Sequence, residues 1–137
     1  MGLSGSVTRD WSVAGGYAYQ DAFITSATAS AAAGRQVGQV PHHTFSLWNK
    51  YQITGRLSAG LGVISRSDSF VAVDNAVVLP GYTRADAAVY YSLGERWRLQ
   101  ANVENLFDSD YFINAHSNTN ISPGSPRALR VGLTARF

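Results

Sequence analysis

Apolar and polar residues alternate along most of the chain with a period of two, which is typical of β-strands and not of helices. The pattern is clearest in the segment 127–137. One face of that segment carries apolar side chains: Leu129, Val131, Leu133, Ala135 and Phe137. The other face carries Arg130, Gly132, Thr134 and Arg136. The two faces therefore meet different surroundings, and we expect lipid on the apolar face and water on the arginine-bearing face.

The same alternation recurs in six earlier segments, and the apolar side chains fall on odd-numbered positions almost throughout. The predicted strands cover approximately residues 3–8, 11–20, 43–53, 57–66, 84–93, 97–104 and 127–137. We expect strands of about ten residues, which is the length that crosses a bilayer when a strand is tilted by roughly 45°. Trp48 has an even number, so its side chain is expected to lie on the same face as the charged residues.

Short turns and long loops alternate between these strands. The short turns are predicted at Arg9-Asp10, Thr54-Gly55 and Gly94-Glu95, and the loops at about 21–41, 67–81 and 108–126. The first loop is rich in Ala, Ser and Gly and is predicted to be flexible. In an antiparallel sheet this order places all short turns at one end and all long loops at the other. That arrangement matches an outer-membrane β-barrel.

Aromatic residues support the same interpretation, because they gather where the strands would meet the membrane surfaces. The group expected at the short-turn rim is Trp11, Tyr51, Tyr91, Trp97 and Phe137, and that at the loop rim is Phe45, Phe107 and Tyr111. A soluble antiparallel sandwich also alternates with period two. The low charge of the strands, their uniform length and the regular order of connections favour the barrel.

The composition excludes several classes of protein. The chain has no cysteine, which excludes disulfides and thiolate metal sites. Ten Arg stand against one Lys, but they are spread singly and form no nucleic-acid-binding motif. No apolar run is long enough for a transmembrane helix, and the start of the chain lacks a signal-peptide pattern, so we expect either a cytosolic protein or a piece of a longer one.

Catalytic and metal sites are not expected. The common nucleophile, zinc and phosphate-loop motifs are missing, so the sequence does not predict an enzyme or a cofactor. His42 and His43 are adjacent on a strand and point to opposite faces, and His116 is alone in a loop, so no metal site is predicted. Asp108 and Asp110 are two residues apart in a loop, where a turn or a weak cation contact is the ordinary explanation.

Two stretches carry a family resemblance. The run Asn102-Val-Glu-Asn-Leu-Phe-Asp-Ser-Asp-Tyr111 resembles the penultimate strand of TonB-dependent outer-membrane receptors. The tail from Asn118 to Phe137, with Pro-Gly-Ser-Pro-Arg before the last strand, resembles the end of these receptors, and Val40-Pro-His-His-Thr-Phe-Ser-Leu-Trp48 resembles their entry into a strand. The amino-acid sequence of these stretches is most similar to that of ferric-siderophore receptors of the catecholate type.

The resemblance implies a barrel of about 22 strands with an N-terminal plug. Residues 1–137 are accordingly expected to be the C-terminal barrel part, an all-β, antiparallel transmembrane segment of about seven strands without the plug. The implied function is TonB-dependent uptake of a ferric siderophore by the full-length protein in the outer membrane. The implied partners are the ferric siderophore, membrane lipid, TonB, the plug and the barrel-assembly machinery. The alternative is a small self-contained outer-membrane barrel with a structural or adhesion role.

The candidate site residues fall into three groups. The motif residues Asn102, Asn105, Leu106, Phe107, Asp108 and Tyr111 are expected to be structural, with Asn and Asp in the turn and the aromatics as interfacial anchors. By resemblance, Phe137 is expected to serve barrel assembly. The candidates for drawing in an anionic ligand at the loop-side mouth are Arg66, Tyr82, Arg84 and Arg127.

Each of these arginines has an alternative role as a wall charge paired with a carboxylate such as Asp68 or Asp86. A further group lies lower on the even-numbered face and is expected to meet the plug or wall carboxylates such as Glu104: Arg98, Arg130 and Arg136.

Overall fold

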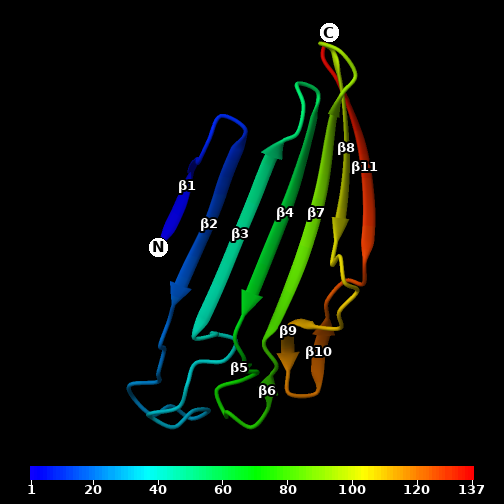
Figure 1. Ribbon diagram of the computed structural model, residues 1–137. Coiled ribbons are helices and arrows are strands. Elements are labelled where there is room, and N and C mark those ends of the chain that lie inside the picture. The colour runs from blue at the N-terminus through cyan, green and yellow to red at the C-terminus, as the bar shows by residue number, and fades with distance from the viewer.

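The computed structural model describes all residues from 1 to 137 and shows a single layer of long strands (Figure 1). Seven strands form one antiparallel sheet in the order β1-β2-β3-β4-β7-β8-β11. Their bounds are β1 Gly2–Ser6, β2 Trp11–Tyr19, β3 His43–Gln52, β4 Leu57–Arg66, β7 Tyr82–Ser92, β8 Trp97–Glu104 and β11 Ala128–Ala135. The predicted all-β, antiparallel, seven-stranded fold is confirmed.

The connections alternate as the sequence predicts. The three short turns lie at one end of the sheet and the three long loops at the other (Figure 1). A uniform strand length of about ten residues is wrong for three strands, because β1 has five residues and β8 and β11 have eight each. The first turn occupies residues 7–10. Val7 and Thr8, which were predicted to belong to the first strand, therefore lie outside it.

Two of the loops contain small hairpins that the sequence did not predict. The second loop pairs β5, Ser69–Phe70, with β6, Val78–Leu79, and the third pairs β9, Phe112–Ser117, with β10, Asn120–Pro123. Strands of two to six residues are too short to show a clear period. The register between β9 and β10 also shifts twice, which hides the alternation further.

The register of the sheet keeps odd positions opposite odd positions, so each face has one parity. Trp11 lies opposite Tyr51, and Val131 lies opposite Ala101. Trp48 lies on the even-numbered face and covers Gly60 and Gly62 of the neighbouring strand β4, where a Cβ would overlap its ring. Glycine at these two positions gives the indole room to lie flat on the sheet.

The sheet has no layer packed on either face, and only 11 of the 137 residues are buried. Large apolar side chains on the odd-numbered face stay exposed, among them Tyr17, Leu61, Val89 and Val131. A soluble sandwich would bury one face against a second sheet, and the two further sheets are hairpins of two strands each. The structure therefore does not support the sandwich alternative. No helix in it is long and apolar enough to cross a membrane.

Buried apolar packing is found among the loops. Val71, Leu79 and Ala115 form a small core, against which Ala72, Val77 and Ile121 pack. This core joins the second loop to the third loop. The loop end therefore contains the small apolar core of the chain, and it also contains the candidate site.

Candidate functional site at the loop end of the sheet

The motif after β8 forms the turn that leads into the third loop. Asn105 and Asp108 have positive φ angles of 51° and 54°, a region that Asn and Asp tolerate better than most residues. The backbone N–H of Leu106 donates to the carbonyl oxygen of Ala85 at 2.7 Å, which ties the start of the turn to β7. The motif thus sets the direction in which the chain leaves the sheet.

Asn105 is the most deeply buried large side chain in the structure, with 1% exposure. Its Nδ2 donates to the carbonyl oxygens of Ser109 at 2.9 Å and Ser125 at 3.1 Å, and its Oδ1 accepts from the N–H of Ser109 at 3.0 Å. One amide therefore satisfies backbone groups at both ends of the third loop. Buried polar groups without such partners would destabilise the turn.

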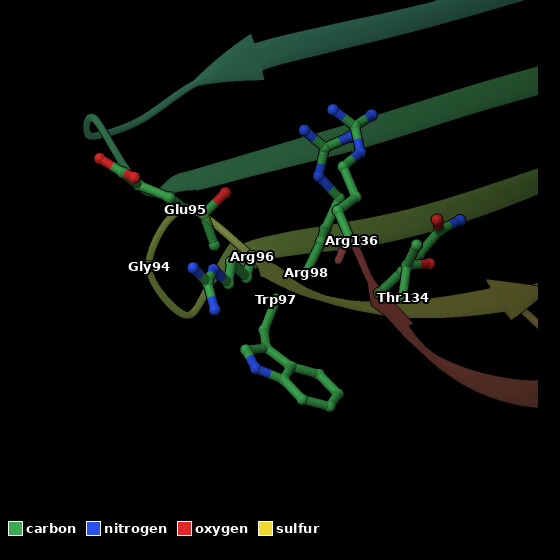
Figure 2. Close-up of a pocket in the computed structure, with 9 residues that line it drawn as sticks. Gly94, Glu95, Arg96, Trp97, Arg98, Thr134 and Arg136 are labelled. Carbon is green, nitrogen blue, oxygen red and sulfur yellow. The ribbon is translucent and has the colours of Figure 1, made fainter.

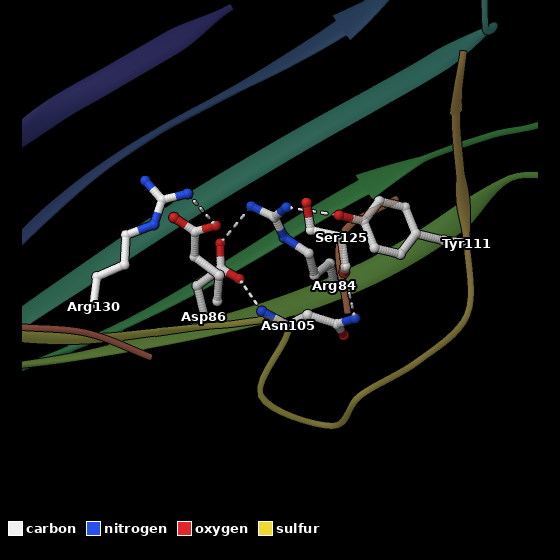
Figure 3. A network of polar contacts seen from close by, with 7 residues as sticks. Arg84, Asp86, Asn105, Tyr111, Ser125 and Arg130 are labelled. Atoms are coloured by element: carbon white, nitrogen blue, oxygen red, sulfur yellow. Dashed lines mark hydrogen bonds and ion pairs between the residues drawn. The ribbon is translucent and has the colours of Figure 1, made fainter. Parts of the chain in front are cut away.

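Asp86 connects this turn to Arg84. One carboxylate oxygen accepts from the backbone N–H of Asn105 at 2.9 Å, and the other pairs with Arg84 at 2.8 Å. Arg84 also donates to the hydroxyl of Tyr111 at 2.9 Å (Figure 3). The guanidinium of Arg84 is thus engaged by Asp86, the ion pair expected of a wall charge, and by Tyr111.

Tyr111 does not lie at the surface as an interfacial anchor, which corrects that expectation. It is buried to 7% exposure, its ring lies 4.7 Å from that of Tyr82, and it packs on Gly124. A Cβ at Gly124 would overlap the tyrosine ring. Phe107, in contrast, is 75% exposed. The burial of Tyr111 follows from the fold of the third loop, which the motif alone does not specify.

The remaining mouth candidates lie in different settings. Arg66 and Tyr82 face each other in the register of β4 and β7. Arg66 donates to the carbonyl oxygens of Gln39 at 2.8 Å and Ile113 at 3.3 Å, so it joins the first and third loops. Arg127 lies before β11, two strands away in the sheet from β7. Its backbone N–H donates to Asp108 at 2.7 Å, while its exposed side chain makes no hydrogen bond or ion pair within the chain.

Further contacts join the three long loops, through residues that sequence reasoning missed. The side chain of Gln39 donates to the carbonyl oxygen of Ala115 at 2.7 Å and accepts from its N–H at 3.3 Å. Asn75 exchanges hydrogen bonds of 2.9 Å with the backbone of Gln36. Asp74-Asn75 is a recognisable turn signal, but nothing in the sequence marks Gln39.

The histidines are engaged in separate contacts. A ring nitrogen of His42 lies 3.0 Å from the amide of Gln36, and one of His43 lies 2.7 Å from the hydroxyl of Tyr17. No group of three or more His, Cys, Asp or Glu side chains comes together in a metal-binding arrangement.

The lower arginines of the even-numbered face differ in their contacts. Arg130 pairs with Glu104 at 3.3 Å, as expected for a wall charge, although the exposed geometry makes such a pair weak. Arg98 and Arg136 line a hollow near the short-turn end, where neither forms an ion pair (Figure 2). At the same end the ring of Phe137 lies 6.4 Å from that of Trp97 on the other face.

Comparison with known proteins agrees with this geometry. Residues 1–106 match the family described as TonB dependent receptor-like, beta-barrel. The whole chain aligns at 30% identity with the probable TonB-dependent siderophore receptor PiuA of Acinetobacter baumannii and at 33% with the catecholate siderophore receptor Fiu of Escherichia coli K12. It spans 20% and 19% of their lengths, about a fifth of each.

The solved structures of these two receptors carry the same fold. The crystal structure of PiuA matches 99% of the chain with a TM-score of 0.90 at 27% identity, and the chain covers 21% of it. The closed form of Fiu matches 99% with a TM-score of 0.86 at 31% identity, and the chain covers 20% of it. The family match over most of the chain and the agreement in fold lead to one conclusion: the chain belongs to the TonB-dependent receptor family, whose β-barrels are outer-membrane proteins.

Proposed function

We propose that this chain is the C-terminal barrel part of an outer-membrane receptor that takes up a ferric siderophore in a TonB-dependent manner. The observation that carries the proposal is the match of nearly the entire sheet and its loops to siderophore receptors. The chain spans about a fifth of such receptors, so uptake would belong to a longer protein that also supplies the plug and the contact with TonB.

The open sheet supports this assignment. β1 pairs only with β2 and β11 pairs only with β8, so both edges have unsatisfied backbone groups. In a membrane such groups must be paired, which requires closure into a barrel. Neighbouring strands of the complete receptor would provide the closure. Lipid would cover the odd-numbered face, and barrel-assembly machinery would recognise the terminal Phe137.

The mouth residues have different roles in this proposal. The side chain of Arg127 is exposed and has no hydrogen bond or ion pair within the chain, so it is the arginine best placed to attract an anionic ferric complex. Arg66 and Tyr82 lie at the rim, where Arg66 also joins loops. Arg84 holds Tyr111 and the third loop in place and acts on the ligand only through them. We propose further that this ferric complex is of the catecholate type.

The test is iron uptake in cells that produce the complete receptor. We expect deletion of its gene to abolish uptake of radioactive iron supplied as a catecholate complex, and loss of TonB to have the same effect. Arg127→Gln should weaken uptake at low ligand concentration through the apparent KM, and Arg9→Gln, at an exposed turn on the far edge of the sheet, is the matched control. Uptake that survives gene deletion unchanged would contradict the proposal.

The self-contained barrel makes a different prediction. If the chain alone folded into a closed barrel, its gel migration would change on heating without any other segment. That result, combined with unchanged iron uptake after gene deletion, would favour the structural or adhesion role.

A further inference from the structure

A hollow of about 400 Å³ lies at the loop end, between the first and second loops. This volume is within the range of roughly 300–1,000 Å³ that small-molecule sites occupy. None of the four mouth candidates lines it. Its polar lining consists of Gln36, His42, His43, Ser67, Asp68 and Ser69.

The hollow borders the odd-numbered face of the sheet. His43 stands at the first position of β3, and its ring centroid lies 5.2 Å from that of Tyr19 on β2. A ring nitrogen of His43 also lies 2.7 Å from the hydroxyl of Tyr17. Both tyrosines have odd numbers and are exposed. The hollow therefore lies beside the face that the proposed function assigns to lipid.

Hydrogen bonds between the two loops hold the walls of the hollow. The backbone N–H of His43 donates to the hydroxyl of Ser67 at 3.1 Å, and the N–H of Ser67 donates to the carbonyl oxygen of His43 at 2.9 Å. Asn75 of the second loop binds the backbone of Gln36 in the first loop through two hydrogen bonds of 2.9 Å. The hollow is therefore formed in the absence of a ligand.

Several polar groups of the lining have no partner within the chain. The carboxylate of Asp68 forms neither a hydrogen bond nor an ion pair. Ser69 is 6% exposed, and its hydroxyl oxygen has no hydrogen-bond partner. His42 and His43 each use one ring nitrogen, so each has a second one free. Because a buried hydroxyl without a partner is costly, this lining favours a ligand that supplies hydrogen bonds.

The charge of the lining restricts the chemistry of that ligand. No Arg or Lys lines the hollow, and Asp68 would repel an anion. No group of three potential metal ligands is present. Phe70 and Val78 add an apolar part. A sugar ring fits all of these features, because its hydroxyl groups donate to a carboxylate and its C–H face lies against an aromatic ring.

We propose that this hollow binds a neutral sugar ring, either free or as the headgroup of a membrane lipid. Its hydroxyl groups bind Asp68, Ser69 and the free nitrogens of the two histidines, and its apolar face lies on Phe70. Ser69 turns its hydroxyl toward the ligand by adopting another staggered rotamer. The inference goes beyond uptake, because the site lies outside the mouth. It rests on the proposed function only in placing the odd-numbered face on the outside of a complete barrel.

The test uses the complete receptor, purified in lauryldimethylamine oxide, a detergent without a sugar headgroup. Fluorescently labelled receptor is applied to an array of immobilised neutral glycans built from glucose, galactose, mannose, rhamnose and N-acetylglucosamine. We expect binding to a subset of these glycans that is equal at low and high salt, since the ligand has no charge to be screened. Absence of binding to every glycan would overturn the proposal, and so would binding that is lost at high salt.

Two variants separate glycan binding from folding. Asp68→Asn should lower the affinity for the best-bound glycan about tenfold, because a charged acceptor becomes neutral. Ser69→Ala should lower it about fivefold through the loss of one hydrogen bond. The melting temperature of Ser69→Ala should not fall, because the hydroxyl has no partner in the free receptor. Asp110→Asn, at an exposed carboxylate of the third loop, is the matched control and should keep full affinity. Full affinity in both lining variants would overturn the proposal.

A competition experiment identifies the source of the sugar. Nanodiscs that contain a glycolipid with the best-bound glycan as its headgroup compete with the same glycan in free form. Stronger competition by the glycolipid indicates a lipid headgroup, and equal competition indicates a free sugar; both results support the proposal. Glycolipid binding that is the same in the wild type and in Asp68→Asn would overturn it.

Iron uptake separates this inference from the proposed function. Asp68→Asn should weaken glycan binding and leave the rate of iron uptake at the wild-type level, because the hollow lies outside the mouth. Loss of uptake in this variant would place the hollow in the uptake route and would refute the present inference alone. Uptake that survives gene deletion, with glycan binding by the purified receptor retained, would refute the proposed function alone.

Discussion

At the scale of residues, a few polar side chains determine how the third loop lies on the sheet. Asn105 ties both ends of the loop, Asp86 joins Asn105 to Arg84, and Arg84 holds the hydroxyl of Tyr111. Each link connects to a group that is buried or half-buried, where an unsatisfied polar atom is costly. Asn105 and Tyr111, two residues of the family motif, therefore make contacts that set the geometry of the third loop.

Gly124 provides a sharp test of this arrangement. Gly124→Ala would place a Cβ into the ring of Tyr111, so we expect a loss of roughly 1–3 kcal/mol in the free energy of unfolding, as for other overpacked sites. Protease cleavage within the third loop should also become faster. Gly132→Ala is the matched control, because no atom lies within 4 Å of a Cβ there. Equal stability of both variants would show that the tyrosine ring is not fixed.

At the scale of elements, strands and loops depend on different forces. The strands follow from period-two alternation and backbone pairing, and their faces need surroundings from outside the chain. The loops have their own small core and several hydrogen bonds between them. Arg66 and Gln39 connect the first and third loops, and Val71 and Ala115 pack the second against the third. The three loops thus form one connected cap at the mouth.

Gln39→Asn should loosen this cap. Asn tolerates the positive φ of 59° at this position, but its shorter side chain cannot keep both contacts with Ala115. We expect the opening free energy of β9 and β10, measured by hydrogen exchange, to fall by about 1–2 kcal/mol, the contribution of one or two buried hydrogen bonds. Exchange in β2 and β3 should not change. Gln20→Ala, an exposed neighbour of the first loop, should have no effect, and identical exchange in both variants would contradict the connected cap.

At the scale of the whole molecule, the chain is one layer with two open edges. Its odd-numbered face exposes large apolar side chains over the length of the sheet, including Leu61, Val89, Val131 and Leu133. Apolar patches of this extent mark a surface that lies against a membrane or a partner, and open edges invite pairing with further strands. Both features point to a structure that is complete only inside a lipid-embedded barrel.

This leads to a prediction for the chain by itself. In aqueous buffer without detergent we expect it to aggregate, and in micelles to remain dispersed, because detergent covers the odd-numbered face. Analytical ultracentrifugation in both conditions measures the difference. A monodisperse monomer in plain buffer with the strand spectrum intact would contradict the assignment of that face to lipid.

The sequence by itself determined the main sheet: seven strands, their antiparallel order of connections, the parity of their faces and the family. These features are local or repeat along the chain, since each strand shows its period and each turn shows its residues. The same parity placed Trp48 on the even-numbered face. Gly60 and Gly62 on that face leave room for its ring.

Only the tertiary structure decided which side chains are engaged at the mouth. Arg84 and Arg127 look alike in sequence. The third loop brings Tyr111 onto the side chain of Arg84, which also pairs with Asp86, whereas it binds Arg127 only at its backbone N–H, through Asp108. The burial of Tyr111, the link through Gln39 and the hairpins in the loops have the same cause. They depend on contacts between segments distant in sequence, which short irregular stretches do not encode in any local pattern.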